Sequence, residues 1–376
     1  MYIIYYKGGI ILVESVAIIS EYNPFHNGHL YQINQIKKIY PNHVIIAIMS
    51  GQFVQRGEPA FFNKFIRTKM ALQACDLVVE LPQFYAMSYA DDFAYGGVQI
   101  AKSLQADVLS FGSEIADINQ LNDLKNQLQT NQKNTNNKLS YAARLLDPSV
   151  IQSNTILALQ YMIQLEKINA NIGLLPIERI QNQYNDRFLT GHISSATAIR
   201  NELLMKNDVS HTVPNPEFMN NKDGVTLAQF YPYIRYSLIQ KDTDELKQIY
   251  TMYEGLENRL KQAAINNESF DTFFKAIQTK RYTNARLQRL LLYILFNIQE
   301  KDKNKFEQFN HIRVLGMNDK GQAYIKSLKQ SDSTINFATN INKSNKIHFD
   351  LEIKATQLYN MIAKNKKNDF NTPVIR

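Results

Sequence analysis

The stretch VAIISEYNPFHNGHLYQI (residues 16–33) reads as a buried strand, a polar loop and the first turns of a helix. The run 16–20 is apolar up to its final serine, which is typical of a strand in a parallel sheet covered on both faces. Turn-forming Asn23 and Pro24 follow it. Apolar residues then recur with helical spacing at Leu30, Ile33, Ile36 and Ile39. With a second apolar run at 43–50, this strand–helix–strand unit predicts a parallel sheet with a right-handed crossover.

The alternation of strands and helices continues to about residue 205. Helical spacing marks 62–74, 93–105, 117–140 and 153–168, and apolar runs mark strands at 76–82, 106–114 and 171–180. This order predicts a doubly wound α/β fold, class α/β with a parallel sheet. We expect that domain over 16–206, a linker rich in Asn, Asp and Pro over 207–224, and a mainly helical domain over 225–376.

The first 15 residues lie outside this pattern, and we expect them to be a dispensable leader. Their apolar part is interrupted by Lys7, Gly8 and Gly9, and no small-residue cleavage site follows, so they do not read as a signal peptide. No window reaches the roughly 20 apolar residues that a membrane span needs. The single cysteine, Cys75, lies in an apolar run that predicts a buried packing role. It leaves no internal disulfide, so we expect a reducing cytoplasm. Because no window could span a membrane, we expect no membrane partner.

Basic residues are concentrated toward the C-terminus. Residues 275–376 carry 19 Lys+Arg against 8 Asp+Glu, whereas the other residues carry 23 against 26, so the formal net charge of +8 arises from this last part. A basic surface favours a polyanionic partner such as RNA. A lysine-rich solvated surface is the alternative.

The polar loop after the first strand has the chemistry of a phosphate site. Ligands of open α/β sheets bind beyond the carboxyl ends of the strands, where a helix that begins offers free backbone N–H groups. His26 and His29 are one helical turn apart, Gly28 lets a phosphate approach the backbone, and Pro24 stiffens the entry. The imidazoles can donate hydrogen bonds or, if protonated, neutralise charge on phosphoryl oxygens. A His-x-x-His metal site and plain surface histidines are the alternatives.

Two motifs resemble those of a known superfamily. HNGH (26–29) after a strand resembles the HxGH signature of the nucleotidylyltransferase superfamily, and GHISSATAIR (191–200) resembles its second motif, which closes over the phosphates. Longer segments are similar to the tRNA(Met) cytidine acetate ligase family, over nearly all of 16–376. They are EYNPFHNGH, SGQFVQRGEPA, DLVVELP, SFGSE, IERI, ISSATAIR, RYTNARLQRLLLYIL and RVLGMNDKG.

The resemblance implies a two-step ligase reaction in a mainly parallel α/β fold. ATP and acetate give acetyl-adenylate and pyrophosphate, and the acetyl group then passes to the wobble cytidine of elongator tRNA(Met), giving N4-acetylcytidine and AMP. Mg²⁺ is expected to bind through the ATP phosphates, with no protein ligands. The partner that the resemblance implies is therefore tRNA.

The resemblance also implies site residues. The catalytic residues would be His26, His29, Ser195 and Arg200. The ATP-binding residues would be Ile19, Glu21, Asn23, Pro24, Phe25, His26, Asn27, Gly28, His29, Gly112, Asn154, Arg179, Ile180, Ser194 and Ser195. By themselves, several of these residues admit other roles. Gly112 could make a tight turn, Asn154 could cap a helix, Arg179 could be a surface charge, and Ser194 or Ser195 could cap the helix that begins near Ala196.

The loop after the second strand carries further polar groups. Gln55, Arg56 and Lys64 could hold the acetate carboxylate, the triphosphate or the cytosine, because Arg suits bidentate contacts with oxyanions. A solvated loop in which Arg56 neighbours Glu58 is the alternative.

Arg281, Arg286 and Arg289 lie beside the apolar spacing of residues 287–294. They could contact tRNA phosphates or form surface salt bridges.

Two other functions compete with the ligase. A small-molecule adenylyltransferase of cofactor biosynthesis would leave the basic region unexplained. A non-catalytic RNA-binding protein with a degenerate nucleotide pocket is disfavoured because both phosphate motifs are intact.

Overall fold

The computed structural model describes residues 14–134, 152–180, 189, 191–219, 224–253, 255–307, 309–331, 334–364 and 366–376. Of the predicted leader, 1–13 lie outside the described residues. Ser15 is not part of a leader, because it is the first residue of strand β1. Its backbone N–H donates to the Asp107 carboxylate (2.7 Å), and its hydroxyl lies 2.9 Å from that of Tyr324.

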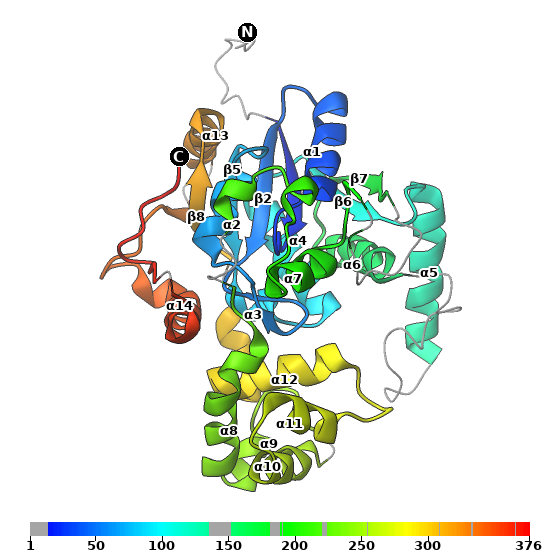
Figure 1. Cartoon of the computed structure of the whole chain (residues 1–376). Coiled ribbons are helices and arrows are strands. Elements are labelled where there is room, and N and C mark those ends of the chain that lie inside the picture. The colour runs from blue at the N-terminus through cyan, green and yellow to red at the C-terminus, as the bar shows by residue number, and fades with distance from the viewer. Residues whose placement is uncertain are drawn as a thin grey trace.

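A seven-stranded sheet forms the centre of the molecule (Figure 1). Its order is β7 (Gly173–Glu178), β6 (Val108–Ser113), β1 (Ser15–Ser20), β2 (Val44–Ser50), β5 (Leu77–Leu81), β8 (His311–Met317) and β9 (Asn336–Ala338). The strands from β7 to β5 are parallel, β8 runs antiparallel to β5, and β9 is parallel to β8. This confirms the predicted α/β class and the parallel sheet.

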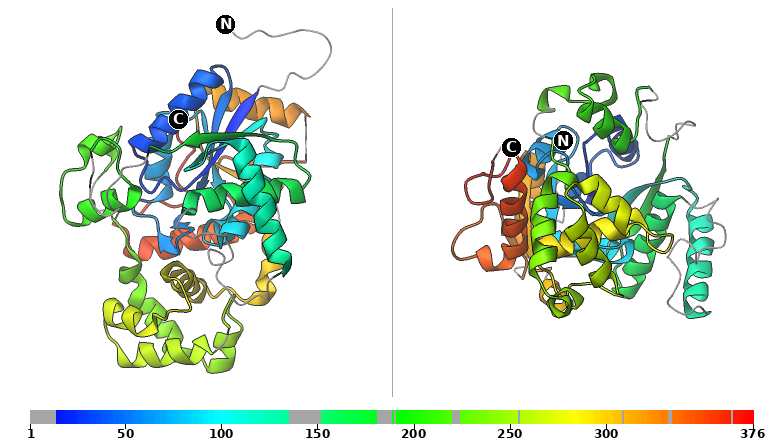
Figure 2. Two further views of the ribbon diagram at one scale, coloured as in Figure 1. Left: turned by 90° about the vertical axis from the view of Figure 1, so that its right-hand side faces the viewer. Right: turned by 60° about the horizontal axis from the view of Figure 1, so that its bottom comes forward.

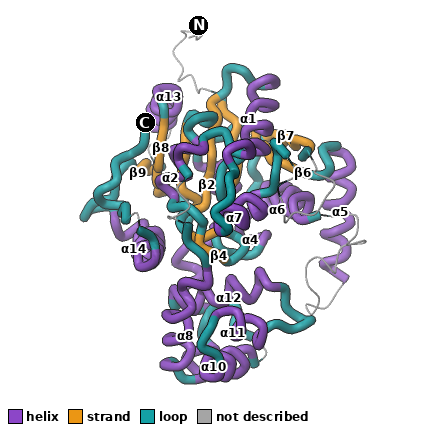
Figure 3. The backbone as a smooth tube through the Cα atoms, in the orientation of Figure 1, coloured by secondary structure: helices purple, strands orange, loops and turns teal. Residues whose placement is uncertain are grey.

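Strand β1 shows why an uninterrupted apolar run was needed. Val16 and Ile18 face one hydrophobic core, whereas Ala17 and Ile19 face the other. Successive strand side chains point to opposite faces, so a strand covered on both sides needs apolar residues at every position. Figure 3 shows the sheet enclosed between layers of helix.

The helices divide between the two faces of the sheet. One core contains residues of α1 (Asn27–Ile39), α2 (Lys64–Ala71) and α7 (Ala196–Leu204). The other contains residues of α3 (Gln83–Ala86), α4 (Ala90–Ser103), α5 (Ile118–Asn134), α6 (Ser153–Lys167), α13 (Asp319–Ser331) and α14 (Asp350–Ile362). Short elements connect them: the hairpin of β3 (Phe53–Val54) with β4 (Glu58–Pro59), and η2 (Ser210–Thr212), η3 (Pro216–Phe218) and η7 (Lys346–Phe349).

A helical unit lies beside one end of the sheet, below it in Figure 1 and again in the left view of Figure 2. It consists of η5 (Leu227–Phe230), α8 (Tyr231–Gln240), α9 (Thr243–Lys247), α10 (Leu256–Asn266), α11 (Phe270–Ile277), α12 (Asn284–Phe296) and η6 (Glu300–Phe306). Its core is continuous with that of the sheet, because Phe53 packs against both Phe230 and Phe296, with ring centroids 5.6 and 5.0 Å apart.

The prediction of one mainly helical domain over 225–376 is wrong beyond residue 310. There the chain returns to the sheet as β8 and β9, and Ile375 bridges to Gly316 of β8. Local sequence patterns cannot reveal this return, because the partner of β8 is β5, more than 200 residues earlier. The predicted linker is also more than a connector, since Val209 and Val213 are buried against the core that contains α1.

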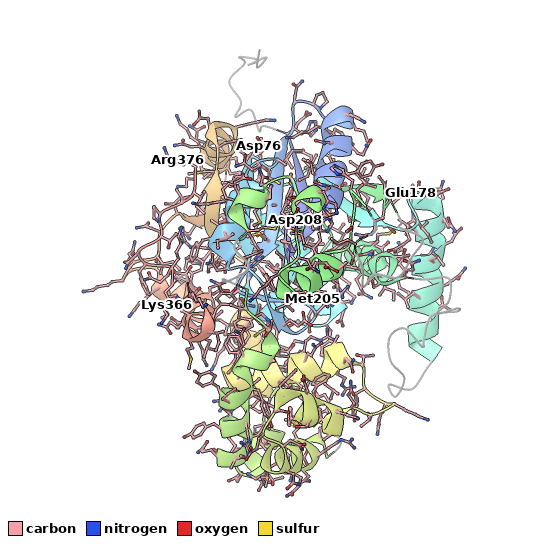
Figure 4. The ribbon with its side chains drawn as sticks, viewed as in Figure 1. Asp76, Glu178, Met205, Asp208, Lys366 and Arg376 are labelled. Atoms are coloured by element: carbon pink, nitrogen blue, oxygen red, sulfur yellow. The ribbon has the colours of Figure 1, made fainter. Side chains whose placement is uncertain are left out.

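The corrected boundary redistributes the positive charge. Residues 225–310 carry 13 Lys+Arg against 10 Asp+Glu, whereas 311–376 carry 11 against 5. The returning segment therefore holds more of the excess than the helical unit does. Lys366 and Arg376 of this segment lie on the side of the molecule that carries α14 and α13 (Figure 4).

Candidate active site

The two histidines of the first motif lie against each other where α1 begins. His26 is the N-cap of the helix, and its Nδ1 accepts the backbone N–H of Gly28 (3.1 Å). The Nδ1 of His29 accepts the backbone N–H of His26 (3.2 Å), and the two rings stack with centroids 3.7 Å apart. A neutral imidazole that accepts at Nδ1 carries its proton at Nε2. Each ring therefore keeps an Nε2–H donor that these contacts do not use.

Both rings are neutral in the ligand-free protein. Burial, together with the nearby Arg179 and Arg200 guanidinium groups, lowers the pKa of His26 to about 3. Burial, His26 and Arg179 likewise hold the pKa of His29 well below its usual value. Of the two roles open to these histidines, hydrogen-bond donation is the one that this state provides.

Aromatic packing fixes the histidine loop from behind. Tyr22 is buried and has a backbone φ of 47°, a left-handed conformation that is uncommon for a tyrosine. Its ring packs edge-on against Phe25 and His29, each at 4.8 Å. The hydroxyl of Tyr22 lies 4.0 Å from the buried Cys75 thiol, whose pKa burial raises to about 12. Cys75 is thus a packing residue, as predicted.

The second motif meets the first at the start of α7. Ser195 is the N-cap of α7 and accepts the backbone N–H of Ala198 (3.1 Å), which confirms the capping role that the sequence left open. Ser194 is buried and donates to the Gly191 carbonyl (3.2 Å). The Asn27 amide donates to the His192 carbonyl (2.8 Å), so the segment before α7 is tied to the segment that opens α1. The two helix N-termini are thereby held together.

Arg200 extends from α7 to the first loop. It donates to the Asn23 carbonyl (2.8 Å) and to the Thr197 hydroxyl (3.4 Å), and it lies 3.7 Å from the Glu58 carboxylate. Burial lowers the pKa of Arg200, and Glu58 and Glu21 oppose that shift. The arginine therefore links three segments that are remote in sequence.

A third group of predicted residues lies where β6 and β7 end. A Cβ on Gly112 would come within 3.3 Å of the Arg179 side chain, so the glycine leaves room for that arginine to lie across the strand. Arg179 is still 41% exposed and is 4.0 Å from Glu114. The Asn154 amide donates to Glu114 (2.6 Å). Asn154 lies within the first turn of α6 and does not cap it, so that alternative is wrong.

The starts of α1 and α7 and the ends of β6 and β7 together form what we call the rim. The loop after β2 brings two further predicted residues to this rim. The Gln55 backbone N–H donates to the Glu21 carboxylate (2.9 Å), and Arg56 donates to the Thr197 hydroxyl (3.3 Å). Arg56 is exposed, and its charge acts on Glu21. Gln55 and Arg56 therefore lie beside Arg200 and Glu21.

Lys64 is not a candidate ligand for acetate or cytosine. Its side chain is fully buried and forms ion pairs with Glu80 and Asp369, both at 2.8 Å. Burial alone would lower the pKa of Lys64, but the two carboxylates outweigh it and raise the pKa. The sequence pointed to the wrong role because Asp369 is 305 residues away from Lys64 along the chain.

The three arginines of the helical unit fall into two groups. Arg281 is exposed and Arg286 is half-buried, and both guanidinium groups lie over the Tyr282 ring, at 5.7 and 4.4 Å. Arg289 is buried, donates to the Gln55 carbonyl (2.9 Å) and stacks over Tyr89 at 4.3 Å. The structure does not favour tRNA contact by Arg289, because its buried guanidinium joins α12 to the loop after β2.

The remaining predicted residues occupy the same loops with different exposure. Pro24 and Phe25 are buried behind the histidines, Ile19 is buried at the end of β1, and Ile180 is 48% exposed beyond β7. Within the described ranges, no group of three or more His, Cys, Asp or Glu side chains could hold a metal ion. Among those same residues, no helix is long and apolar enough to cross a membrane.

Sequence reasoning missed two residues that organise this rim. Glu114 accepts from Asn154 and from both the backbone N–H and the hydroxyl of Thr155 (each 2.8 Å), so it holds the N-terminus of α6. Thr197 binds both Arg56 and Arg200. Glu114 ends the quoted segment SFGSE, and its position directly after a strand was the available signal.

Comparison with known proteins places the chain in a family. The model described as HIGH Nucleotidyl Transferase matches residues 13–372. The tRNA(Met) cytidine acetate ligase of Staphylococcus carnosus (strain TM300) is 40% identical over 97% of this chain and 98% of its own. That of Staphylococcus aureus (strain JH9) is 42% identical over 97% and 99%.

Two crystal structures share the fold. Thermotoga maritima TmcAL bound with alpha-thio ATP is similar with a TM-score of 0.83 and 27% identity, and its apo form with 0.85 and 28%. Each comparison covers 96% of this chain and 99% of the other. From the family model and the curated relatives it follows that this chain belongs to the tRNA(Met) cytidine acetate ligase family of HIGH nucleotidyl transferases.

Proposed function

We propose that this chain is an ATP-dependent ligase that activates acetate as acetyl-adenylate and acetylates the wobble cytidine of elongator tRNA(Met). One observation carries the proposal: the N-termini of α1 and α7 are tied together through Asn27, with both imidazole Nε2–H groups and Arg200 beside them. Backbone N–H groups at helix N-termini and fixed donors bind phosphate. The names of the relatives supply the substrates: ATP in alpha-thio form, acetate and tRNA(Met) cytidine.

The first step is attack of the acetate carboxylate on the α-phosphorus of ATP. His26, His29, Ser195 and Arg200 hold the triphosphate and stabilise charge as pyrophosphate leaves, which is the main demand of phosphoryl transfer. Gly112, Asn154 and Arg179 hold the remainder of the nucleotide. Arg56 and Gln55 orient the acetate. Mg²⁺ would accompany the nucleotide through its phosphates and add positive charge there.

In the second step, the cytidine N4 amine attacks the acetyl carbonyl and AMP leaves. The tRNA reaches the rim from the side of the helical unit, whose α12 contacts the 55–58 loop through Arg289 and Gln288. Arg281 and Arg286 contact its phosphates. The compartment is the cytoplasm, where both tRNA and ATP are present.

A labelling experiment separates this function from its rivals. The full chain is incubated with radiolabelled acetate, ATP and bulk tRNA, and the tRNA is digested to nucleosides. We expect label in N4-acetylcytidine, dependent on ATP. Pyrophosphate release without labelled tRNA would instead identify a small-molecule adenylyltransferase. Binding of tRNA without either product would identify a non-catalytic RNA-binding protein.

A further inference from the structure

Glu21 lies at the centre of the rim, and although the resemblance counts it among the ATP-binding residues, its negative charge does not suit the phosphates. It is the first residue after β1, and Arg67 fixes its backbone by donating to its carbonyl (2.6 Å). Arg67 is fully buried and also donates to the Ser50 carbonyl (3.0 Å), so the ends of β1 and β2 are joined under this position. The direction in which the Glu21 side chain leaves the strand is therefore set by the core.

The two oxygens of Glu21 are not equivalent. Oε1 accepts the Gln55 backbone N–H at 2.9 Å, whereas within the described part of the chain Oε2 accepts no hydrogen bond. The neighbouring Glu58 differs, because its Oε1 accepts from Gln288 (3.0 Å) and its Oε2 faces Arg200 (3.7 Å). Of Glu21 and Glu58, only Glu21 is held through one oxygen while its other oxygen is available to accept a hydrogen bond from a ligand.

Titratable groups surround Glu21. They come from four segments: Arg56 and Glu58 from the loop, Arg200 from α7, Tyr161 from α6 and Arg67 from α2. Burial raises the pKa of Glu21, while Arg56 and Arg200 oppose the rise. Because its pKa is raised, the Glu21 carboxylate binds a proton more strongly than an exposed one does.

We propose that Glu21 is the general base of the acetyl-transfer step, with its Oε2 accepting the N4–H of the target cytosine. This inference rests on the proposed function. A carboxylate is the side-chain group suited to accept from the exocyclic amine of cytosine. A general base must lie within hydrogen-bond reach of the proton that it takes.

The step balances without another reactant. The N4 lone pair attacks the acetyl carbonyl carbon and forms the C–N bond. The bond between that carbon and the phosphate oxygen of acetyl-adenylate breaks, and AMP leaves with the electron pair. The N4 proton passes to Glu21 Oε2 and from there to solvent.

The histidines are unsuited to this task. Their Nδ1 atoms already accept backbone N–H groups, and each Nε2 carries a proton. In adenylation, acetate attacks phosphorus as an anion, so that step needs no base. Loss of Glu21 should therefore affect the second step far more than the first.

The test measures the two steps separately in Glu21→Gln. Adenylation is followed as acetate-dependent exchange of labelled pyrophosphate into ATP without tRNA, and we expect it to lose far less than transfer does. Transfer to tRNA in a single turnover should fall by about 10² to 10⁴, the range for a general base. Glu58→Gln is the matched control, and it should change both steps together because Glu58 acts on Arg200.

The pH dependence and a conservative variant complete the test. Wild-type transfer should decrease as the pH falls through the raised pKa of Glu21, Glu21→Gln should lose that dependence, and Glu21→Asp should recover part of the rate. Equal loss of both steps in Glu21→Gln, or unchanged transfer, would overturn the inference. Absence of tRNA acetylation by the wild-type protein would instead overturn the proposed function itself.

Discussion

At the scale of single residues, His26 has a structural task as well as a chemical one. It caps α1 through Nδ1, and its Nε2–H takes no part in that cap. Because His26 is only 5% exposed, its replacement can change stability as well as chemistry. The two tasks can be separated by choosing the replacement.

Changing His26→Asn should remove the Nε2–H donor and keep a capping oxygen. Adenylation should fall by about 10², the effect of losing one transition-state donor. The free energy of unfolding should change little, whereas His26→Ala should lose about 1 kcal/mol more because the cap is absent. Pyrophosphate exchange and urea unfolding of both variants are the measurements. Normal exchange in His26→Asn together with reduced stability would assign the histidine to packing alone.

The lowered pKa of His26 also predicts how stability depends on pH. In the unfolded chain a histidine titrates near about 6.5, but burial keeps the folded His26 neutral down to a pKa of about 3. Between these values only the unfolded chain binds the proton, so the free energy of unfolding decreases as pH falls, by up to about 1.4 kcal/mol per pH unit for each such histidine. Urea unfolding at pH 7 and 5.5 should show a smaller decrease for His26→Asn than for wild type.

At the scale of elements, a buried ionic cluster joins α2, β5 and the C-terminal tail. Lys64 pairs with Glu80 and Asp369, and the Asp369 side chain also accepts from Thr356 of α14 (2.5 Å). Removal of one member of a buried pair leaves an uncompensated charge, which costs more than the pair contributes. The stability of α2 therefore depends on the C-terminal tail being in place.

Replacing Lys64→Met should destabilise the protein by about 3–5 kcal/mol, because two buried carboxylates lose their partner. Lys69→Met, at an exposed position of the same helix, should change stability by less than about 0.5 kcal/mol. The measurement is the free energy of unfolding of the two variants in denaturant. A stable Lys64→Met protein with a raised KM for acetate would restore Lys64 as a substrate ligand.

The elements also mark where sequence reasoning succeeds. Residues 16–50 contain two strands and a helix. The spacing of their apolar residues can be recognised within a short stretch of sequence, so their type and order were predictable. The resemblance supplied His26, His29, Ser195 and Arg200, and the structure brings them to one rim. Roles that depend on remote partners were not predictable. The sequence gives no sign that Lys64 pairs with Asp369 or that Arg289 donates to the Gln55 carbonyl, because these partners are remote along the chain.

At the scale of the whole molecule, we expect the helical unit and the rim to bind tRNA together. Arg281 and Arg286 are on the helical unit, and α13 lies at the opposite end of the sheet (Figure 1). Changing both arginines to Glu should weaken tRNA binding and lower its salt dependence by about one counterion per lost phosphate contact. Adenylation without tRNA should survive. The control pair Lys326→Glu and Lys329→Glu on α13 should leave the salt slope nearly unchanged, and equal effects of the two pairs would refute this docking face.

The return of the chain as β8 and β9 has a consequence for synthesis on the ribosome. The sheet begins with the first described residues, yet β8 and β9, as well as Asp369 and Ile375, are translated only after the entire helical unit. Until then the Lys64 charge has only Glu80 beside it, and the edge of β5 has no partner strand. We therefore expect a chain that lacks Asp369 and Ile375 to keep both phosphate motifs while Lys64 and β8 lose contacts, and to be more sensitive to proteases than the full chain.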